Sequence, residues 1–291
     1  MNRKQEIKAS ESGTFTIGGD LEINRLGYGA MRITGGGIWG PPDNKAEALR
    51  VLRRLPKLEV NFIDTADSYG PDVSEELIAE ALHPYPDGML IATKGGLTRP
   101  GPNQWTPNGD PAYLRSCLEG SLKRLKVDCI DLYQLHRIDS KVPMEDSLGA
   151  LKKAQEEGLI RHIGLSEVDV DQLEKASNIV DVVTVQNMYN LTERRWEDTL
   201  KWCEAHKVGF IPWYPLSAGS INSQKVIAKV AQKHGASEFQ VALAWLLQHS
   251  PVMLPIPGTS SVAHLEENVA AASLKLDEED MQELNDLGKS E

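Results

Sequence analysis

The sequence predicts a (β/α)8 barrel with an N-terminal β-hairpin and long loops over the C-terminal mouth of the barrel. Short apolar runs alternate with amphipathic stretches along the 291 residues, as in a parallel sheet covered by helices on both faces. No GxGxxG motif follows an early strand, so the fingerprint of a doubly wound dinucleotide-binding sheet is missing. Chemically versatile polar residues recur where predicted strands end, and a closed barrel gathers its active site from those ends.

The elements follow in a regular order. A hairpin comes first, with Phe15–Ile17 and Leu21–Ile23 flanking a Gly-Gly-Asp turn. Eight strands are predicted at Arg25–Tyr28, Val60–Thr65, Met89–Thr93, Cys129–Leu135, Ile160–Leu165, Val182–Val185, Val208–Trp213 and Met253–Ile256. The amphipathic stretches between them predict helices at Ala46–Leu58, Ser74–Leu82, Tyr113–Leu125, Glu145–Glu157, Val170–Asn178, Arg195–His206, Val226–His234 and Phe239–Gln248.

Two Gly/Pro-rich stretches, Gly35–Pro42 and Thr98–Pro111, each follow a strand and are predicted to lie over the barrel mouth. No composition break or low-complexity segment separates one part of the chain from another. The sequence therefore predicts one domain over residues 1–291.

Composition limits the classes of partner. The formal net charge of -11 repels phosphate backbones and anionic headgroups, which argues against general binding of nucleic acid or membrane surfaces. No apolar run reaches the length of a membrane span, and the polar N-terminus lacks the apolar core of a signal peptide. The three cysteines have no CxxC spacing, which suits a reducing compartment. We expect a cytoplasmic protein without a structural metal, and its oligomeric state stays open.

Four titratable residues follow predicted strands two, three and four: Asp64, Tyr69, Lys94 and His136. Barrel geometry would bring them to one mouth. A phenol is a weak acid with a pKa near ~10, and an adjacent ammonium group lowers that pKa. Asp64 would hold Lys94, and His136 would orient a carbonyl oxygen toward Tyr69. This set can protonate the alkoxide that forms when a hydride reaches a carbonyl carbon.

Beyond these four residues, the sequence resembles the aldo-keto reductase family over about Leu26 to Asn268. The resemblance rests on VNFIDTADSYG from Val60, on the SEELI that follows it, and on Lys94 and His136. Further along, RHIGLS, VQNMYN and IPGT…EEN match in order. The family implies a (β/α)8 barrel closed at its base by the hairpin. It also implies NADPH-dependent reduction of an aldehyde or ketone, with Tyr69 as proton donor and Asp64, Lys94 and His136 completing a catalytic tetrad.

The resemblance also assigns cofactor-binding residues. Ser166 and Gln186 match positions that bind the nicotinamide carboxamide, and Trp213 matches the aromatic residue that stacks on the ring. Glu167 stands where Asn is common; it can accept a hydrogen bond from the amide but cannot donate one. The loop expected to wrap the pyrophosphate contributes Pro215, Leu216, Ser217 and Gly219. The segment after the last strand contributes Gly258, Thr259, Ser260, Ser261 and His264, and Glu267 and Asn268 match positions that bind adenine.

The largest departure from the family concerns the 2′-phosphate of NADPH. Relatives usually place Lys or Arg after the last strand. Here the hydroxyls of Thr259, Ser260 and Ser261 and the amides that open the next helix are the expected ligands, with His264 as a minor candidate. NADPH is the expected cofactor, and NADH is possible.

The substrate is a small carbonyl compound, and its identity is the least determined part of the prediction. Met31, Trp39 and Trp105 are candidates for the pocket, although each could instead pack or anchor a loop. GYGAM, GPP and PGTSSVAHL resemble bacterial family members that act on pyridoxal and other aromatic aldehydes. Two alternatives remain: a nicotinamide-binding regulatory protein like potassium-channel β subunits, and an NAD-dependent alcohol dehydrogenase.

Overall fold

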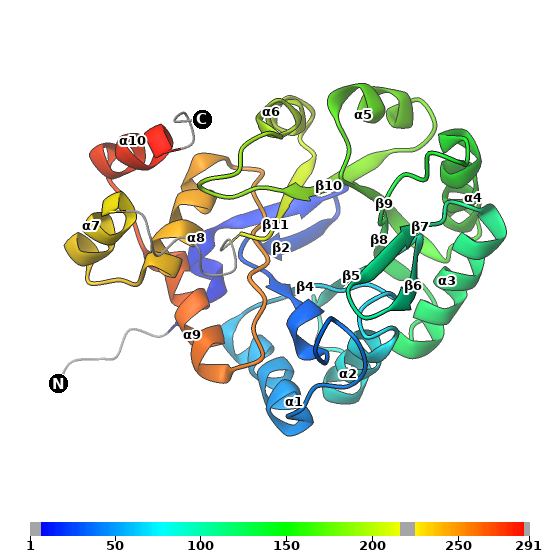
Figure 1. Cartoon of the computed structure of the whole chain (residues 1–291), viewed down its shortest axis with the longest axis horizontal. Helices are drawn as coiled ribbons and strands as arrows, with labels where there is room; N and C mark the ends of the chain where they lie inside the picture. Colours follow the sequence, from blue (N-terminus) through cyan, green and yellow to red (C-terminus); the bar gives the residue numbers. More distant parts are fainter. Residues whose placement is uncertain (1–6, 216–224, 288–291) are drawn as a thin grey trace.

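The computed structural model describes residues 7–215 and 225–287, and Figure 1 shows a curled central sheet surrounded by helices. Parallel strands pair in the order β11-β10-β9-β8-β5-β4-β3 and form a seven-stranded sheet. Their bounds are β3 (Tyr28–Gly29), β4 (Phe62–Asp64), β5 (Leu90–Gly95), β8 (Ile130–Leu135), β9 (Ile160–Ser166), β10 (Val182–Met188) and β11 (Gly209–Trp213). The predicted barrel class is confirmed.

The eighth predicted strand, Met253–Ile256, closes the barrel without forming a regular ladder. On one side, the amide of Phe210 donates to Val252 and the amide of Leu254 donates back to Phe210, both at 2.8 Å. On the other side, the carbonyl of Pro255 accepts from Gly27 at 2.9 Å. Pro255 and Pro257 have no amide hydrogen, so this segment cannot donate at every position that a regular strand would use.

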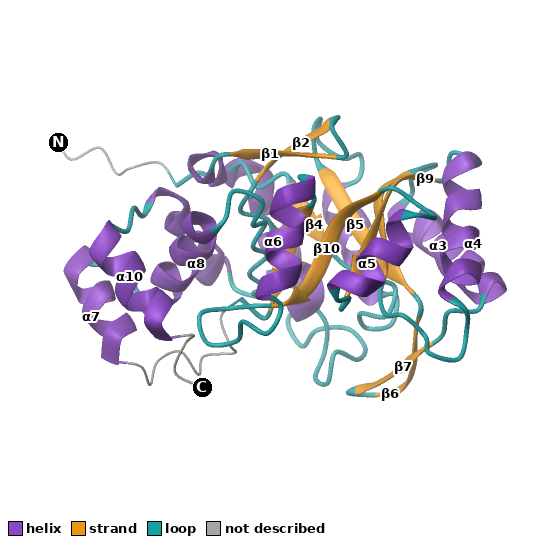
Figure 2. Cartoon of the chain, turned by 90° about the horizontal axis from the view of Figure 1, so that it is seen from above, coloured by secondary structure: helices purple, strands orange, loops and turns teal. Residues whose placement is uncertain are grey.

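The antiparallel hairpin of β1 (Thr14–Ile17) and β2 (Leu21–Asn24) lies at the amino-terminal end of the barrel. Its side chains Ile17 and Ile23 are fully buried and pack with Phe62, Leu132 and other residues that point into the barrel. Figure 2 shows a second hairpin at the opposite end, made of β6 (Leu97–Gly101) and β7 (Gln104–Pro107). The loop predicted at Thr98–Pro111 thus holds two short antiparallel strands.

Helices surround the sheet: α1 (Lys45–Arg54), α2 (Val73–Leu82), α3 (Pro111–Leu125), α4 (Met144–Glu156), α5 (Val170–Ser177), α6 (Glu197–His206), α7 (Lys225–His234), α8 (Glu238–His249), α9 (Val262–Ala270) and α10 (Glu278–Leu287). Short 3-10 turns lie at Ala9–Ser12, Ala30–Ile33, Leu55–Leu58 and Ala271–Ser273. The helix predicted at Ala46–Leu58 ends early, at Arg54, because Pro56 cannot donate within an α-helix. The last helix, α10, was not predicted.

Helix boundaries follow local capping chemistry. The Asp110 carboxylate accepts from the amide of Tyr113 at the start of α3, and Pro111 occupies the first turn, where no amide donor is needed. Asp169 and Gln172 form a capping box at α5. These caps fix where each helix leaves the loop above the barrel, and therefore where the site residues in those loops lie.

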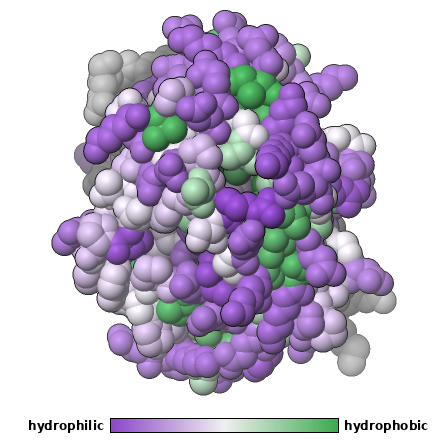
Figure 3. Space-filling model, turned by 90° about the vertical axis from the view of Figure 1, so that its right-hand side faces the viewer, coloured by the Kyte–Doolittle hydropathy of each residue, from purple (hydrophilic) through white to green (hydrophobic). Residues whose placement is uncertain are grey.

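The apolar core has two layers. Side chains such as Tyr133, Leu148, Leu165 and Phe210 fill the space between the sheet and the outer helices, while a smaller cluster fills the barrel itself. The face over α3 and α4 is mostly hydrophilic, with apolar atoms in separate small patches (Figure 3). Among the described residues, no helix is long and apolar enough to cross a membrane.

Candidate active site

The four predicted catalytic residues meet at the carboxyl end of the barrel. Asp64 ends β4, Lys94 lies near the end of β5, and His136 follows β8 directly. Sheet register pairs Lys94 with Gln134 of β8, two residues before His136. Residues two apart along a strand point to the same side of the sheet, so Gln134 and His136 both point to the interior side.

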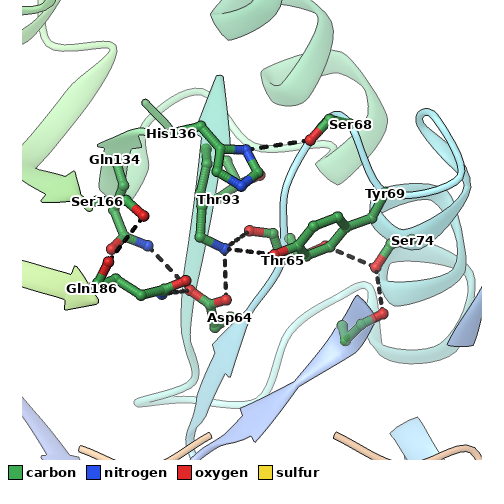
Figure 4. A network of polar contacts seen from close by, with 12 residues as sticks. Asp64, Thr65, Ser68, Tyr69, Ser74, Thr93, Gln134, His136, Ser166 and Gln186 are labelled. Atoms are coloured by element: carbon green, nitrogen blue, oxygen red, sulfur yellow. Dashed lines mark hydrogen bonds and ion pairs between the residues drawn. The ribbon is translucent and has the colours of Figure 1, made fainter. Parts of the chain in front are cut away.

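Lys94 contacts three neighbours, Asp64, Thr65 and Tyr69, which lie close together in Figure 4. Its Nζ donates to Asp64 Oδ2 at 2.6 Å and to the carbonyl of Thr65 at 2.7 Å, and it lies 3.4 Å from the Tyr69 hydroxyl. The side chains of Lys94 and Asp64 are 0% and 2% exposed. Burial lowers the pKa of Lys94, but Asp64 and Tyr69 together outweigh that effect and raise it. The ammonium group is therefore charged at neutral pH.

The second oxygen of Asp64 is also occupied. Its Oδ1 accepts from Gln186 Nε2 at 2.7 Å and from Gln134 Nε2 at 3.1 Å. A buried ion pair is tolerated only when further hydrogen bonds satisfy its remaining atoms. These two amides supply those bonds and fix the orientation of the carboxylate toward Lys94.

Tyr69 is held between the lysine and two aromatic neighbours. Its ring packs edge-on against His136 at 5.9 Å and against Trp105 at 6.3 Å between centroids. Lys94 lowers the pKa of Tyr69, as expected, but it does not bring that pKa below its ordinary value. Burial raises that pKa, and the opposing effect of Lys94 is smaller. The phenol therefore keeps its proton at neutral pH.

His136 is buried next to positive charge. Burial lowers the pKa of the imidazole well below its ordinary value, and Lys94, Arg137 and Arg99 push it in the same direction. The ring is therefore neutral at physiological pH. Its Nδ1 lies 3.3 Å from the Ser68 hydroxyl. When that hydroxyl donates, the imidazole proton resides on Nε2 and can serve as a hydrogen-bond donor.

Arg99 joins the two loops over the mouth. It donates to Ser68 O at 2.5 Å, to Gly37 O at 3.1 Å and to Gln104 O at 2.9 Å. Its guanidinium lies 3.5 Å from the ring centroid of Trp105 and 5.6 Å from that of Trp39. Trp105 thus packs beside Tyr69 and His136, and Arg99 links Trp105 to Trp39. Met31, in the turn Ala30–Ile33, is half-buried, and its carbonyl accepts from Thr34.

The residues predicted to hold the nicotinamide lie at the ends of β9, β10 and β11. Register pairs Ser166 with Gln186 and Met188 with Trp213. Gln186 uses its side-chain nitrogen on Asp64, which leaves its oxygen as an acceptor for a ligand. The Ser166 hydroxyl donates to the carbonyl of Gln186 and accepts from Arg137 at 2.9 Å.

The predicted phosphate end is more open. Gly258 and Ser260 are exposed, Thr259 is buried and Ser261 half-buried; His264 is exposed on α9, where Glu267 and Asn268 also lie. A carboxylate that the sequence did not indicate is already present: Glu47 of α1 accepts from the amide of Val262 at 3.0 Å. Pro215 is buried after β11, whereas Leu216, Ser217 and Gly219 fall outside the described residues.

Several residues of the site were not predicted. Gln134 follows from the alternation of strand residues and could have been found two positions before His136. Arg99, Arg137 and Glu47 carry no such signal, because their partners come from distant segments. The described residues hold no cluster of three or more His, Cys, Asp or Glu that could bind a metal.

Known proteins similar to this chain define its family. The family model for the aldo/keto reductase family matches residues 25–289. An uncharacterised oxidoreductase of Schizosaccharomyces pombe is 52% identical, covering 98% of this chain and 93% of its own. Pyridoxine 4-dehydrogenase of Escherichia coli is 42% identical, covering 96% and 99%. An aldo/keto reductase of Klebsiella pneumoniae, solved with NADP and acetate, has a TM-score of 0.82 and 26% identity, covering 94% and 95%.

The fold and the site define an oxidoreductase built on a parallel α/β barrel. The chain belongs to the aldo/keto reductase family.

Proposed function

We propose that the protein is an NADPH-dependent carbonyl reductase that converts an aromatic aldehyde, such as pyridoxal, into its alcohol. The observation that carries this proposal is the buried chain of contacts from Asp64 through Lys94 to Tyr69. Lys94 Nζ lies 2.6 Å from Asp64 Oδ2 and 3.4 Å from the Tyr69 hydroxyl. Such a chain places a protonated phenol beside a fixed cation, which is the requirement for protonating a developing alkoxide.

The residues at the strand ends fit a nicotinamide. The Gln186 oxygen can accept from a carboxamide NH2. The Ser166 hydroxyl donates its hydrogen to the Gln186 carbonyl and keeps a lone pair that can accept, and the half-buried Trp213 presents an aromatic face. When bound, the reduced nicotinamide supplies a hydride to the carbonyl carbon. Tyr69 then gives its proton to the carbonyl oxygen, and Lys94 stabilises the phenolate that remains.

The other two residues of the tetrad prepare this step. Neutral His136 donates from Nε2 to the carbonyl oxygen and orients it toward Tyr69. Asp64 holds Lys94 in place and is itself held by Gln134 and Gln186. The bonds that hold Asp64 and Lys94 are therefore already made in the protein and need not form during the reaction.

An aromatic substrate is supported by the walls of the site. Trp105 packs against both Tyr69 and His136, and Arg99 ties Trp105 to Trp39. A flat ring can stack in such surroundings. The name of the Escherichia coli relative, pyridoxine 4-dehydrogenase, refers to an alcohol whose aldehyde is pyridoxal.

The test is a panel of pyridoxal, benzaldehyde and butyraldehyde with NADPH and NADH. We expect kcat/KM to be highest for the aromatic aldehydes with NADPH. Absence of turnover, together with tight cofactor binding, would favour a regulatory protein instead.

Oxidation of an alcohol with NAD+ is a second candidate, favoured by Glu47 at the phosphate end. It predicts a higher kcat/KM for pyridoxine with NAD+ than for pyridoxal with NADPH.

A further inference from the structure

Glu167 has an unusual backbone at the end of β9. Its φ is 56°, in the left-handed region that L-residues other than Asn and Asp seldom adopt. Its amide donates to the carbonyl of Gln186 at 3.0 Å, which fixes the residue against β10. A strained backbone is kept where the surrounding contacts determine it, and such positions cluster at functional sites.

The side chain of Glu167 binds the aromatic residue of the predicted cofactor site. Its Oε1 accepts from Trp213 Nε1 at 2.6 Å and from the amide of Met188 at 2.7 Å. Bonds from donors to a carboxylate are shorter and stronger than neutral ones. The orientation of the indole is therefore set by Glu167 as well as by packing.

An opposite charge lies nearby. Arg137 donates to the Ser166 hydroxyl, and its side chain is half-buried. Burial lowers the pKa of Arg137, and the charge of Glu167 acts against that effect. The two charges therefore influence each other across the residues predicted to bind the carboxamide, so removing either one changes the field there.

We propose that Glu167 is a positioning residue that fixes the Trp213 indole and holds a negative charge beside the nicotinamide, so that the site binds the oxidised cofactor more tightly than the reduced one. This inference rests on the proposed function, because it takes the ring to lie against Trp213.

The physical reason is the change of charge during the reaction. The nicotinamide ring is neutral when reduced and cationic when oxidised, so a fixed carboxylate favours the oxidised form. Positive charge already develops on the ring as the hydride departs, and an interaction that strengthens along this path also lowers the barrier. Glu167 is half-buried, so water screens its charge less than that of a surface carboxylate.

The test is the dissociation constant of NADP+ and of NADPH, measured by calorimetry on the wild type and on Glu167→Gln. Gln keeps an oxygen acceptor for Trp213 and Met188 but removes the charge. We expect the NADP+ dissociation constant to rise about tenfold, equivalent to ~1.4 kcal/mol, while that for NADPH changes less than about twofold. Equal changes for both cofactors, or none, would overturn the proposal.

Two further variants separate charge from stacking. Trp213→Phe should weaken both cofactors and leave their ratio unchanged, because the carboxylate remains. Arg137→Gln should shift the ratio the opposite way, toward NADP+, and it keeps the proposal testable if Glu167→Gln fails to fold. An Arg137→Gln ratio equal to that of the wild type would contradict the electrostatic account.

A surface variant serves as the matched control. Glu174→Gln removes the same charge from an exposed position on α5 and should leave both constants unchanged. If wild-type protein binds neither cofactor, the proposed function fails. If it binds both and Glu167→Gln leaves their ratio intact, only this inference fails.

Discussion

The catalytic end and the phosphate end of the predicted cofactor site are built in opposite ways. At the catalytic end, Asp64, Lys94 and Tyr69 are buried and joined through short contacts. At the phosphate end, Ser260 and His264 are exposed, and Glu47 already occupies an amide of α9. Charges in a low-dielectric interior act strongly, whereas exposed groups are screened by water. We therefore expect the catalytic step to depend on buried groups that the fold fixes, and the choice between NADPH and NADH to depend on a few exposed groups.

The largest effect is expected on the free energy of unfolding when the buried Asp64–Lys94 ion pair is broken. Lys94→Met leaves the Asp64 carboxylate without its cation, and breaking such a pair costs about 3–5 kcal/mol. Urea unfolding should show this loss. Asp64→Asn combined with Lys94→Met should recover part of it, because no unpaired charge remains. If Lys94→Met is as stable as the wild type, Asp64 does not need Lys94 as its partner.

Substitutions at the phosphate end should have a smaller effect, and they should strengthen a function, the preference for NADPH, rather than weaken the fold. His264→Arg or Ser260→Lys adds a permanent cation, and Glu47→Gln removes an anion from the start of α9. A hydrogen bond to a charged group contributes ~1.5–3 kcal/mol, so His264→Arg and Ser260→Lys should each raise the ratio of kcat/KM for NADPH over NADH by at least about tenfold. Glu47→Gln should raise it by less, because it removes a carboxylate that Arg50 already pairs with and adds no new donor. Steady-state kinetics with both cofactors provide the ratio. A wild-type ratio in the thousands that none of the three variants changes would mean that other residues bind the phosphate.

The smallest effect is expected for the dependence of kcat on pH. The pKa of His136 lies well below its ordinary value and that of Tyr69 above it, so neither group changes protonation around neutrality. We expect kcat for reduction to be flat between about pH 6.5 and 8.5, a range that lies within the ordinary pKa values of the two side chains, ~6.5 for His and ~10 for Tyr. A fall of kcat centred near ~6.5, absent from a conservative His136→Gln variant, would show that His136 titrates and is not held neutral.

The sequence predicts the barrel well because its signal is local. Alternating apolar and amphipathic runs locate β4, β5 and β8 and the polar residues at their ends. The sequence pattern is less accurate at prolines. It predicts a regular strand where Pro255 and Pro257 lack amide donors, and it extends a helix past Pro56. Glu47 and Arg99 could not be found, because their partners become neighbours only in the folded chain. The burial of Tyr69 could not be predicted either, and burial outweighs the expected effect of Lys94 on the pKa of the phenol.

The most direct test of the account is the rate of Tyr69→Phe with pyridoxal, measured separately with NADPH and with NADH. Loss of a positioned acid lowers rates by at least about 100-fold. Because the two ends are built independently, we expect the same factor with both cofactors and unchanged cofactor dissociation constants. A rate near that of the wild type with either cofactor would remove Tyr69 from the mechanism and contradict the account.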